Sequence, residues 1–341
     1  MDMQVTPSHI MQVGLGFWAS KTLLSAVELD LFTLVATKPM TAAQIADALS
    51  LHPRSYRDFL DALVALKLLD REGDGPSSVY RNTKDTGVFL VKTSPAYLGG
   101  ILEMANARLY PFWSHLTTAL RTGKPQNEAA QGKGDMFAEL YADESRLEQF
   151  LRAMQGIQMG NLVALAEKID FKKHKTLCDV GGANANLAAY IAKQHPHLAC
   201  TSFDLPAVEK VAKRHVEAMG QATRVNVVSG DFFADALPKA DVVTMGNILH
   251  DWDESQKKAL VKKAYDAVNP GGMFIAIEAI IDDARRENAF GLLMSLNMLI
   301  ELPGGFDYTG AQFDVWAREA GFSRTEIVPL AGPSSAAIAY K

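Results

Sequence analysis

The stretch that most constrains the fold is residues 176–190, which read TLCDVGGANANLAAY. It opens with the apolar run 177–180, a pattern typical of a buried parallel strand. A tight step at Gly181 and Gly182 follows, and then a run of small residues that favours a helix. Glycine lets the backbone approach a ligand, and a helix N-terminus offers free N–H groups. The stretch therefore predicts the front end of a nucleotide-binding α/β unit, although similar turns occur in proteins that bind nothing there.

The chain from residue 175 onward alternates between strand and helix patterns, which predicts a parallel sheet with right-handed crossovers. Further along, two β-rich runs flank Gly332 and Pro333 and predict a hairpin, so that the sheet ends with an antiparallel strand. We expect strands at 175–180, 198–203, 224–229, 240–245, 272–279, 323–330 and 335–340, and helices at 185–194, 206–219, 254–268 and 285–301.

The earlier part of the chain is mainly helical in pattern. Residues 9–36 carry apolar residues at helical spacing around a wide face, which favours one helix buried both in the core and against a second chain. A plain core helix explains this pattern nearly as well. Residues 95–165 also favour helices, with a loop at 131–135 and a long helix at 146–168.

Residues 41–90 have the pattern of a winged helix-turn-helix. Thr41 is expected to begin a helix, with Gln44 in the capping-box position. A second helix at 53–69 and a turn-rich wing at 70–80 complete the pattern. A DNA-binding regulator is therefore a rival hypothesis of a different class.

Charge argues against nucleic acid as a partner. The 341 residues carry a net charge of −5, and Arg54 and Arg57 stand beside Asp58 and Asp61 in the second predicted helix. A DNA-reading helix needs basic side chains for the phosphates, and this block lacks that footprint.

Composition describes an ordinary globular protein, with 48% hydrophobic and 21% charged residues. Cys178 and Cys200 both fall in predicted strands, so we expect reduced thiols and neither a disulfide nor a metal site. The first residues lack the pattern of a signal peptide, and no apolar run approaches the length of a membrane span. The expected location is cytoplasmic, with no membrane partner.

Polar residues follow successive predicted strands. Asp204, about twenty residues past the glycine turn, is placed as the acceptor for a ribose diol, although a helix N-cap is the alternative. Asp231 and Phe232 follow the third strand and are suited to an adenine amino group and ring. The fourth strand runs into MGNILHDWD, so four strand ends converge on the crevice where such folds bind ligands. NAD is a weaker fit, since Gly181 and Gly182 do not complete G-x-G-x-x-G.

DVGG, FDLP, SGDFF, MGNILHDWD, NPGG and PGGFDYT occur in this order. Together they resemble the caffeic acid/acetylserotonin-type class I S-adenosylmethionine (SAM)-dependent O-methyltransferases, over essentially the whole chain. The resemblance implies a Rossmann-like α/β methyltransferase sheet with an antiparallel terminal strand, and a winged-helix dimerisation domain. It also implies SAM as cofactor, a homodimer and a small-molecule acceptor. The expected domains are dimerisation at 1–94, a helical substrate-covering region at 95–168 and SAM binding at 169–341.

The resemblance also implies roles for individual residues. His250 would be the general base, supported by the acids Glu278 and Asp307, and no metal is expected. The residues expected to bind the cofactor are Asp179, Gly181, Gly182, Asp204, Leu205, Asp231, Phe232 and Asn247.

The chemistry is consistent with this assignment. SAM is already an activated methyl donor, so the protein must supply position and, for a hydroxyl acceptor, a base. A neutral histidine can take the proton, and an acid beside it would fix its tautomer. A thioether sulfur needs no base, so S-methylation of a small carboxylate such as 4-methylthio-2-hydroxybutyrate, toward dimethylsulfoniopropionate, stays open, as do C-methylation and a SAM-sensing regulator.

Some positions depart from the family pattern. Ala183 and Ala185 stand where glycines are usual, and Gly246 stands where plant members often carry lysine. Phe306 and Tyr308 replace polar residues beside Asp307, which is therefore expected to matter less than Glu278.

Two classes of acceptor are consistent with the residues expected around the pocket. Arg108 and Arg152 would hold an anionic acceptor, whereas a neutral aromatic acceptor would lie against apolar side chains. Residues of the predicted 146–168 helix are expected to form one wall of the pocket. With them, the residues expected to bind the acceptor are Arg108, Tyr110, Trp113, Arg152, Met154, Gln158, Asn297, Met298 and Phe306.

Overall fold

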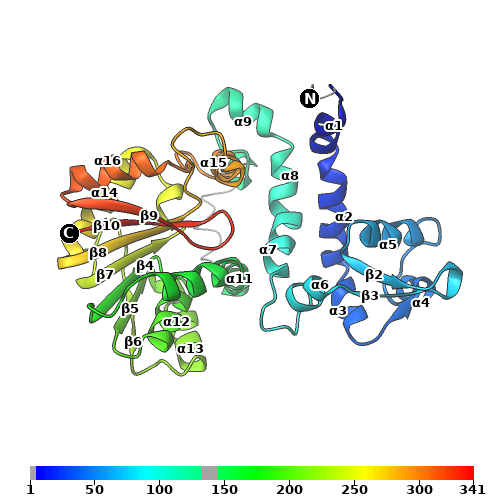
Figure 1. The fold of residues 1–341 in the computed structure, drawn as a ribbon, viewed down its shortest axis with the longest axis horizontal. Helices are drawn as coiled ribbons and strands as arrows, with labels where there is room; N and C mark the ends of the chain where they lie inside the picture. Colours follow the sequence, from blue (N-terminus) through cyan, green and yellow to red (C-terminus); the bar gives the residue numbers. More distant parts are fainter. Residues whose placement is uncertain (1–4, 132–143) are drawn as a thin grey trace. The chain divides into compact units, whose positions relative to one another are not determined.

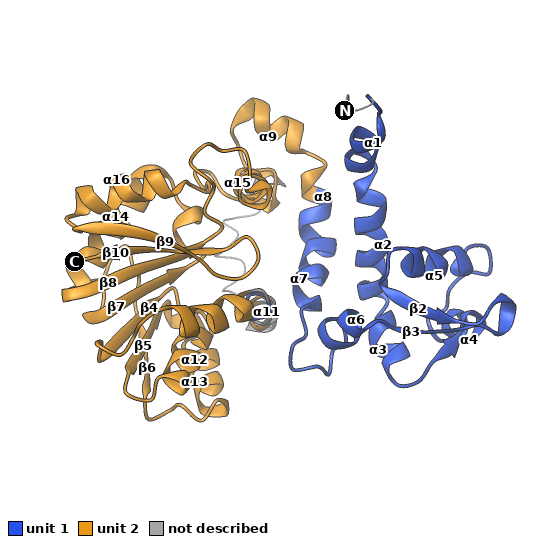
Figure 2. Ribbon diagram, viewed as in Figure 1, with its two compact units in different colours: residues 1–111, 152–157 blue, residues 112–151, 158–341 orange. Residues whose placement is uncertain are grey.

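The computed structural model describes residues 5–131 and 144–341. It divides into two compact units (Figure 2). The N-terminal unit comprises Met1–Pro111 and Arg152–Ile157, and the C-terminal unit comprises Phe112–Leu151 and Gln158–Lys341. The three-part division at residues 94 and 168 stays a prediction, and the loop predicted at 131–135 lies, after its first residue, outside the described residues.

The C-terminal unit is built on a seven-stranded sheet of order β6-β5-β4-β7-β8-β10-β9 (Figure 1). The strands from β6 to β8 run parallel, and β10 is antiparallel to both of its neighbours, as the sequence predicts. The strand bounds are β4 Thr176–Val180, β5 Ala199–Asp204, β6 Val225–Ser229, β7 Ala240–Gly246, β8 Val268–Glu278, β9 Arg324–Pro329 and β10 Ser335–Tyr340.

Helices cover both faces of this sheet (Figure 1). One buried apolar cluster joins the strands to α12, α13 and the end of α11, and a second joins them to α14 and α16. The sheet is therefore buried on both faces, which explains its nearly continuous apolar strands. The helix bounds are α11 Glu144–Lys168, α12 Asn186–Gln194, α13 Glu209–Ala218, α14 Glu254–Ala267, α15 Ala289–Glu301 and α16 Gly310–Ala320.

The prediction of a single helix over 9–36 is wrong. The segment forms α1 (Ser8–Gly14), α2 (Gly16–Glu28) and α3 (Leu31–Ala36). Glycines at the first break have low helix propensity, and Asp30 adopts a left-handed φ of 58° at the second. The turn at Asp30 redirects the chain so that α3 packs into the core of the N-terminal unit.

The winged-helix pattern matches the rest of this unit. Its strands form an antiparallel sheet of order β1-β3-β2, and Thr41 and Gln44 make the predicted capping box. The predicted helix at 53–69 is shorter, because Lys67 turns the chain with a φ of 59°. The bounds are β1 Met40–Thr41, α4 Ala42–Ala48, α5 Tyr56–Ala65, β2 Leu69–Glu72, β3 Val79–Asn82, α6 Lys84–Phe89 and α7 Gly99–Met104.

Short helices link the units in the chain. A π-helical turn at Ala105–Leu109 precedes α8 (Tyr110–Trp113) and α9 (Leu116–Thr122), which ends at a left-handed Gly123. None of the helices in the described ranges combines the length and the apolar character that a bilayer crossing requires.

Candidate active site

The glycine turn after β4 is closely packed. A Cβ atom on Gly182 would lie 2.2 Å from Ser202 Oγ and 3.1 Å from Asp179 Oδ2, so only glycine fits. Gly181 has a φ of 69°, and the next residues keep unusual backbones as alanines, with φ of 52° at Ala183 and 63° at Ala185. The turn therefore keeps a glycine-like path even where glycine is replaced.

Asp204 lies at this turn, as expected. Its carboxylate accepts hydrogen bonds from the backbone N–H of Ala183 at 2.7 Å and of Leu205 at 2.6 Å. Burial raises the pKa of Asp204, and these two donors act in the opposite direction. A small hollow opens beside it, lined in part by Leu205, Val208 and Glu209. The structure thus brings the glycine turn and the predicted ribose acceptor together.

The third and fourth strand ends lie close to the turn. Phe232 reaches within 4.0 Å of the position that a Cβ on Gly181 would take, and its ring meets Trp252 edge-on at 5.9 Å. The carboxylate of Asp231 accepts from the N–H of Phe233. Asn247 follows β7 with a left-handed φ of 52°, and the next residue, Ile248, reaches within 2.3 Å of the same Cβ position on Gly181. Three strand ends therefore converge on the glycine turn.

Asp179 has a different environment from the other predicted cofactor residues. It is buried within β4, and its Oδ1 accepts from Thr244 Oγ1 at 2.7 Å. Burial raises the pKa of Asp179 to about 7. Its side chain supports the turn from the sheet side.

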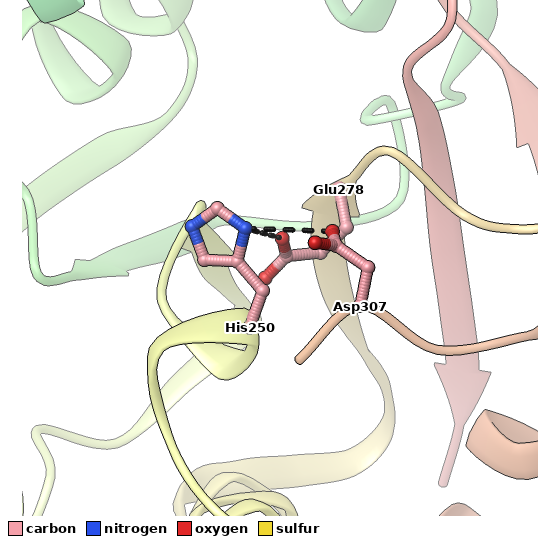
Figure 3. A group of neighbouring side chains, drawn as sticks. All are labelled: His250, Glu278 and Asp307. Atoms are coloured by element: carbon pink, nitrogen blue, oxygen red, sulfur yellow. Dashed lines mark ion pairs between the residues drawn. The ribbon is translucent and has the colours of Figure 1, made fainter. Parts of the chain in front are cut away.

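His250 lies with Glu278 and Asp307 in one buried cluster (Figure 3). Its Nδ1 is 3.6 Å from Glu278 Oε2 and 3.4 Å from Asp307 Oδ1. The other ring nitrogen, Nε2, is 3.4 Å from Asp251 Oδ1. Asp251, which the sequence interpretation did not assign, is thus a third carboxylate against the imidazole. Asp307 approaches as closely as Glu278, despite the departures in its motif.

The electrostatics of this cluster follow from burial and charge. Burial alone would lower the pKa of His250, but the carboxylates of Glu278, Asp251 and Asp307 together raise it. Burial raises the pKa of Glu278 to about 7 and that of Asp251 to about 6. The imidazole therefore lies among carboxyl groups whose pKa values are raised by burial, and the titrations of these groups are coupled.

The cluster also has unused hydrogen-bonding capacity. Among the described residues, His250 Nδ1, Glu278 Oε2 and both carboxylate oxygens of Asp307 are buried without a hydrogen-bond partner. Orphaned buried atoms are uncommon, and a group of them requires an explanation such as a catalytic role or a bound ion or water. The donor atoms of His250, Glu278 and Asp307 lie within 4.8 Å of one another, so a metal ion is the competing occupant, and its predicted absence stays a prediction.

Comparison with known families decides the assignment. Residues 113–323 match the O-methyltransferase domain, and residues 11–92 match the O-methyltransferase dimerisation domain. The chain belongs to the O-methyltransferase family. This confirms the resemblance drawn from the motifs, and the dimerisation domain supports a homodimer.

Individual relatives span the whole of this O-methyltransferase. The tetracenomycin polyketide synthesis 8-O-methyl transferase TcmO of Streptomyces glaucescens is 41% identical, over 98% of this chain and 97% of the relative. The 3-hydroxy-5-methyl-1-naphthoate 3-O-methyltransferase of Streptomyces sahachiroi is 34% identical, over 96% and 93%. The crystal structure of human N-acetylserotonin methyltransferase in complex with SAM superposes with a TM-score of 0.91 at 29% identity, covering 100% of this chain and 99% of that one.

S-adenosylmethionine is the cofactor of this O-methyltransferase. The turn after β4 fits such a group, because the Asp204 carboxylate lies beside the turn, where a ribose diol would find an acceptor. The cofactor contacts of Asp204, Phe232 and the glycine turn stay predictions.

The predicted acceptor residues of the O-methyltransferase fall in both units. Arg108, Tyr110 and Met154 belong to the N-terminal unit, with Arg108 in the π-helical turn, and the side chain of Arg152 lies outside the described ones. The C-terminal unit holds Trp113, Gln158, Asn297, Met298 and Phe306. Of these, Met298 is buried in α15, and Gln158 accepts from Asn161.

α15 connects two of these residues to the His250 cluster. Trp113 Nε1 donates to Asn297 Oδ1 at 2.9 Å. Two residues earlier on the same helix, Ser295 Oγ accepts from the backbone N–H of Asp307 at 3.2 Å. α15 also packs against the turn that carries His250. Trp113 is thereby held on the helix that borders the cluster.

Proposed function

We propose that this O-methyltransferase methylates a phenolic hydroxyl of an aromatic small molecule, with His250 as the general base. The observation that carries the proposal is the placement of His250 Nδ1 between Glu278 and Asp307. Two carboxylates within 3.6 Å of one ring nitrogen favour the tautomer that carries its proton there and stabilise the imidazolium. Nε2 is then the nitrogen that accepts the proton of the hydroxyl.

The chain's own residues supply position and proton transfer. When bound, SAM supplies an electrophilic methyl group, which the acceptor oxygen attacks. As the oxygen attacks, its proton passes to His250 Nε2, and Asp251 at 3.4 Å is close enough to stabilise the new N–H. The burial of His250, Glu278 and Asp307 keeps bulk water away from Nδ1 and its two carboxylates.

The acceptor class follows from the relatives and from the side chains near the cluster. TcmO acts in the synthesis of a polyketide, and the second relative acts on a hydroxynaphthoate. In the C-terminal unit, Trp113 and the partly buried Phe306 offer apolar surface of the kind that an aromatic ring packs against. A neutral or weakly acidic phenol suits this set.

A product screen tests this function directly. The protein is incubated with SAM and a panel of phenols, hydroxynaphthoates and thioether carboxylates, and masses increased by one methyl group are located by fragmentation. We expect methoxy products from aromatic hydroxyls only. A methylsulfonium or C-methyl product without any methoxy product would overturn the proposal in favour of the other acceptor atoms.

Asp204→Ala is expected to weaken S-adenosylhomocysteine binding about 5–150-fold, since losing the acceptor of two hydroxyls costs about 1–3 kcal/mol. Isothermal titration calorimetry measures the change, and thermal unfolding confirms that the fold is kept. Glu209→Gln, at the rim of the same hollow, is the matched control and should bind normally. Equal affinity for Asp204→Ala and wild type would remove Asp204 from the cofactor site.

Ala183→Gly is expected to stabilise the protein by up to about 1 kcal/mol, because a left-handed φ strains alanine but not glycine. Urea unfolding measures the gain. Ala188→Gly, in the interior of α12, is the control and should be destabilising. A loss of stability for Ala183→Gly would show that the backbone there is unstrained.

A further inference from the structure

Lys257 is a buried cation that has no role in the methyl transfer proposed above. It lies in the first turn of α14 and has no exposed surface. Over the described residues, it is the one lysine or arginine that is buried. Burying an ammonium is unfavourable unless charges or dipoles compensate it, so its surroundings require an explanation.

The ammonium bridges two segments of the catalytic cluster. Lys257 Nζ donates to the backbone carbonyl of Trp252, in the turn that carries His250. Lys257 Nζ also lies 3.4 Å from the centroid of the ring of Phe306, the residue that precedes Asp307 in the chain. Lys257 therefore contacts both the segment that bears the base and the segment that bears one of its acids.

These two segments are packed closely against each other. Phe306 N–H donates to the carbonyl of His250 at 2.8 Å. A Cβ on Gly305 would lie 2.9 Å from that same carbonyl oxygen and 3.0 Å from the one of Asp251. A small shift of either segment would change the distances from His250 to Asp307, so a residue that contacts both fixes the geometry of the site.

The charge of Lys257 balances the cluster. The buried carboxyl groups of Glu278 and Asp307 and the partly exposed one of Asp251 face His250 and Lys257, and the exposed Asp253 lies at the start of α14. Burial lowers the pKa of Lys257 to about 8, while these carboxyl groups act to raise it. Tyr308, also buried beside Glu278 and Asp307, adds no charge, because burial raises the pKa of its hydroxyl.

We propose that Lys257 is a positioning residue of the O-methyltransferase, whose ammonium holds the turn of His250 against the segment of Asp307 and disfavours protonation of His250. The inference rests on the proposed base role of His250. As long as Lys257 keeps its proton, its positive charge lowers the affinity of the neighbouring coupled acids and bases for protons. Without the positive charge of Lys257, the cluster retains a proton to higher pH. At a given pH, a smaller fraction of His250 is then neutral and able to act as a base.

The test replaces Lys257 with methionine, which keeps the volume and removes the charge. We expect the acidic limb of the kcat–pH profile to move to higher pH by about one unit or more, with activity recovering at alkaline pH. Binding of S-adenosylhomocysteine should stay at the wild-type level. Lys262→Met, an exposed position on the same helix, is the matched control and should leave the limb in place.

A second variant and a second measurement keep the inference testable. If Lys257→Met fails to fold, Lys257→Gln takes its place in the test. Glutamine retains a donor for the Trp252 carbonyl, and this variant should shift the acidic limb in the same direction. An NMR titration of the imidazole signals, with His250→Gln assigning His250 among the eight histidines, reports the same shift without turnover. A lowered Tm with an unmoved limb and an unmoved His250 titration would overturn the inference.

The outcomes separate this inference from the base role. If His250→Gln remains active and the wild type has no acidic limb, the base role fails, while the NMR titration still measures the effect of Lys257. If the wild type has the limb and neither Lys257 variant moves it, the base role stands and the positioning role of Lys257 is rejected.

Discussion

His250→Gln is expected to lower kcat about 10²–10⁴-fold, because a positioned base contributes that much to the removal of the hydroxyl proton. Glutamine preserves polarity near Glu278 and Asp307 but cannot take up a proton. Binding of S-adenosylhomocysteine, measured by calorimetry, should be unchanged, since the cofactor contacts are assigned to the strand ends around Asp204. Activity within a few-fold of the wild type would refute base catalysis and favour an acceptor that has no proton to lose.

The base role of His250 also predicts the direction in which kcat changes with pH. The base works only when His250 is neutral, so kcat should rise with pH as the imidazolium loses its proton. The neighbouring carboxylates raise the pKa of His250, so the acidic limb should lie above the ordinary histidine value of about 6.5. Glu278→Gln and Asp307→Asn each remove a negative charge and should move the limb to lower pH.

A chelator control accompanies these measurements. The donor atoms of His250, Glu278 and Asp307 could instead hold a metal ion. Base catalysis predicts full activity after extended treatment with EDTA, followed by buffer exchange. Activity that EDTA removes and one divalent cation restores would assign the cluster to metal binding.

Phe17→Ser combined with Trp18→Ser is expected to weaken the homodimer by at least about a hundredfold, because buried aromatic residues dominate interface energies. Both side chains belong to an exposed apolar face of α1 and α2, at 52% and 61% exposed. Multi-angle light scattering across a dilution series measures the shift from dimer to monomer. The face also contains Ile10, Met11 and Val13.

The design of this test follows from the breaks in the 9–36 segment. Deleting residues 1–36 would also remove Leu31 and Phe32 from the core of the N-terminal unit, so a deletion would not test the interface alone. The paired serine variant leaves that core intact. Leu66→Ser, an exposed apolar residue of the same unit, is the control. A stable dimer of the Phe17/Trp18 variant would place the interface elsewhere.

Much of the site was predictable because parallel strands bring their ends to one edge. Asp204, Phe232 and His250 are far apart in the chain, yet each follows a strand of the same sheet. Strand periodicity and the glycine turn were therefore sufficient to place them together. α16 was missed although Thr309 and Gln312 form a capping box like that of Thr41 and Gln44, so a signal for it was present.

Other features depended on tertiary structure. Lys257 sits in a polar run, ESQKKAL, and nothing in local pattern separates it from the exposed Lys258. Its burial arises only when α14 packs beside Phe306, which lies about fifty residues later in the chain. The break at Asp30 likewise depends on a left-handed backbone, which apolar periodicity does not encode.

The position of β10 has a consequence for how the protein is made. β10 follows β9 in the chain but lies between β8 and β9, with Ser335 opposite Glu278 and Tyr340 opposite Met273. On the ribosome, β8 therefore has an unpaired edge until residues 335–340 have emerged. Exposed strand edges invite pairing with other chains, so the nascent protein is most prone to aggregate during this interval. The environment of Glu278, and with it the catalytic cluster, is completed only when this strand inserts.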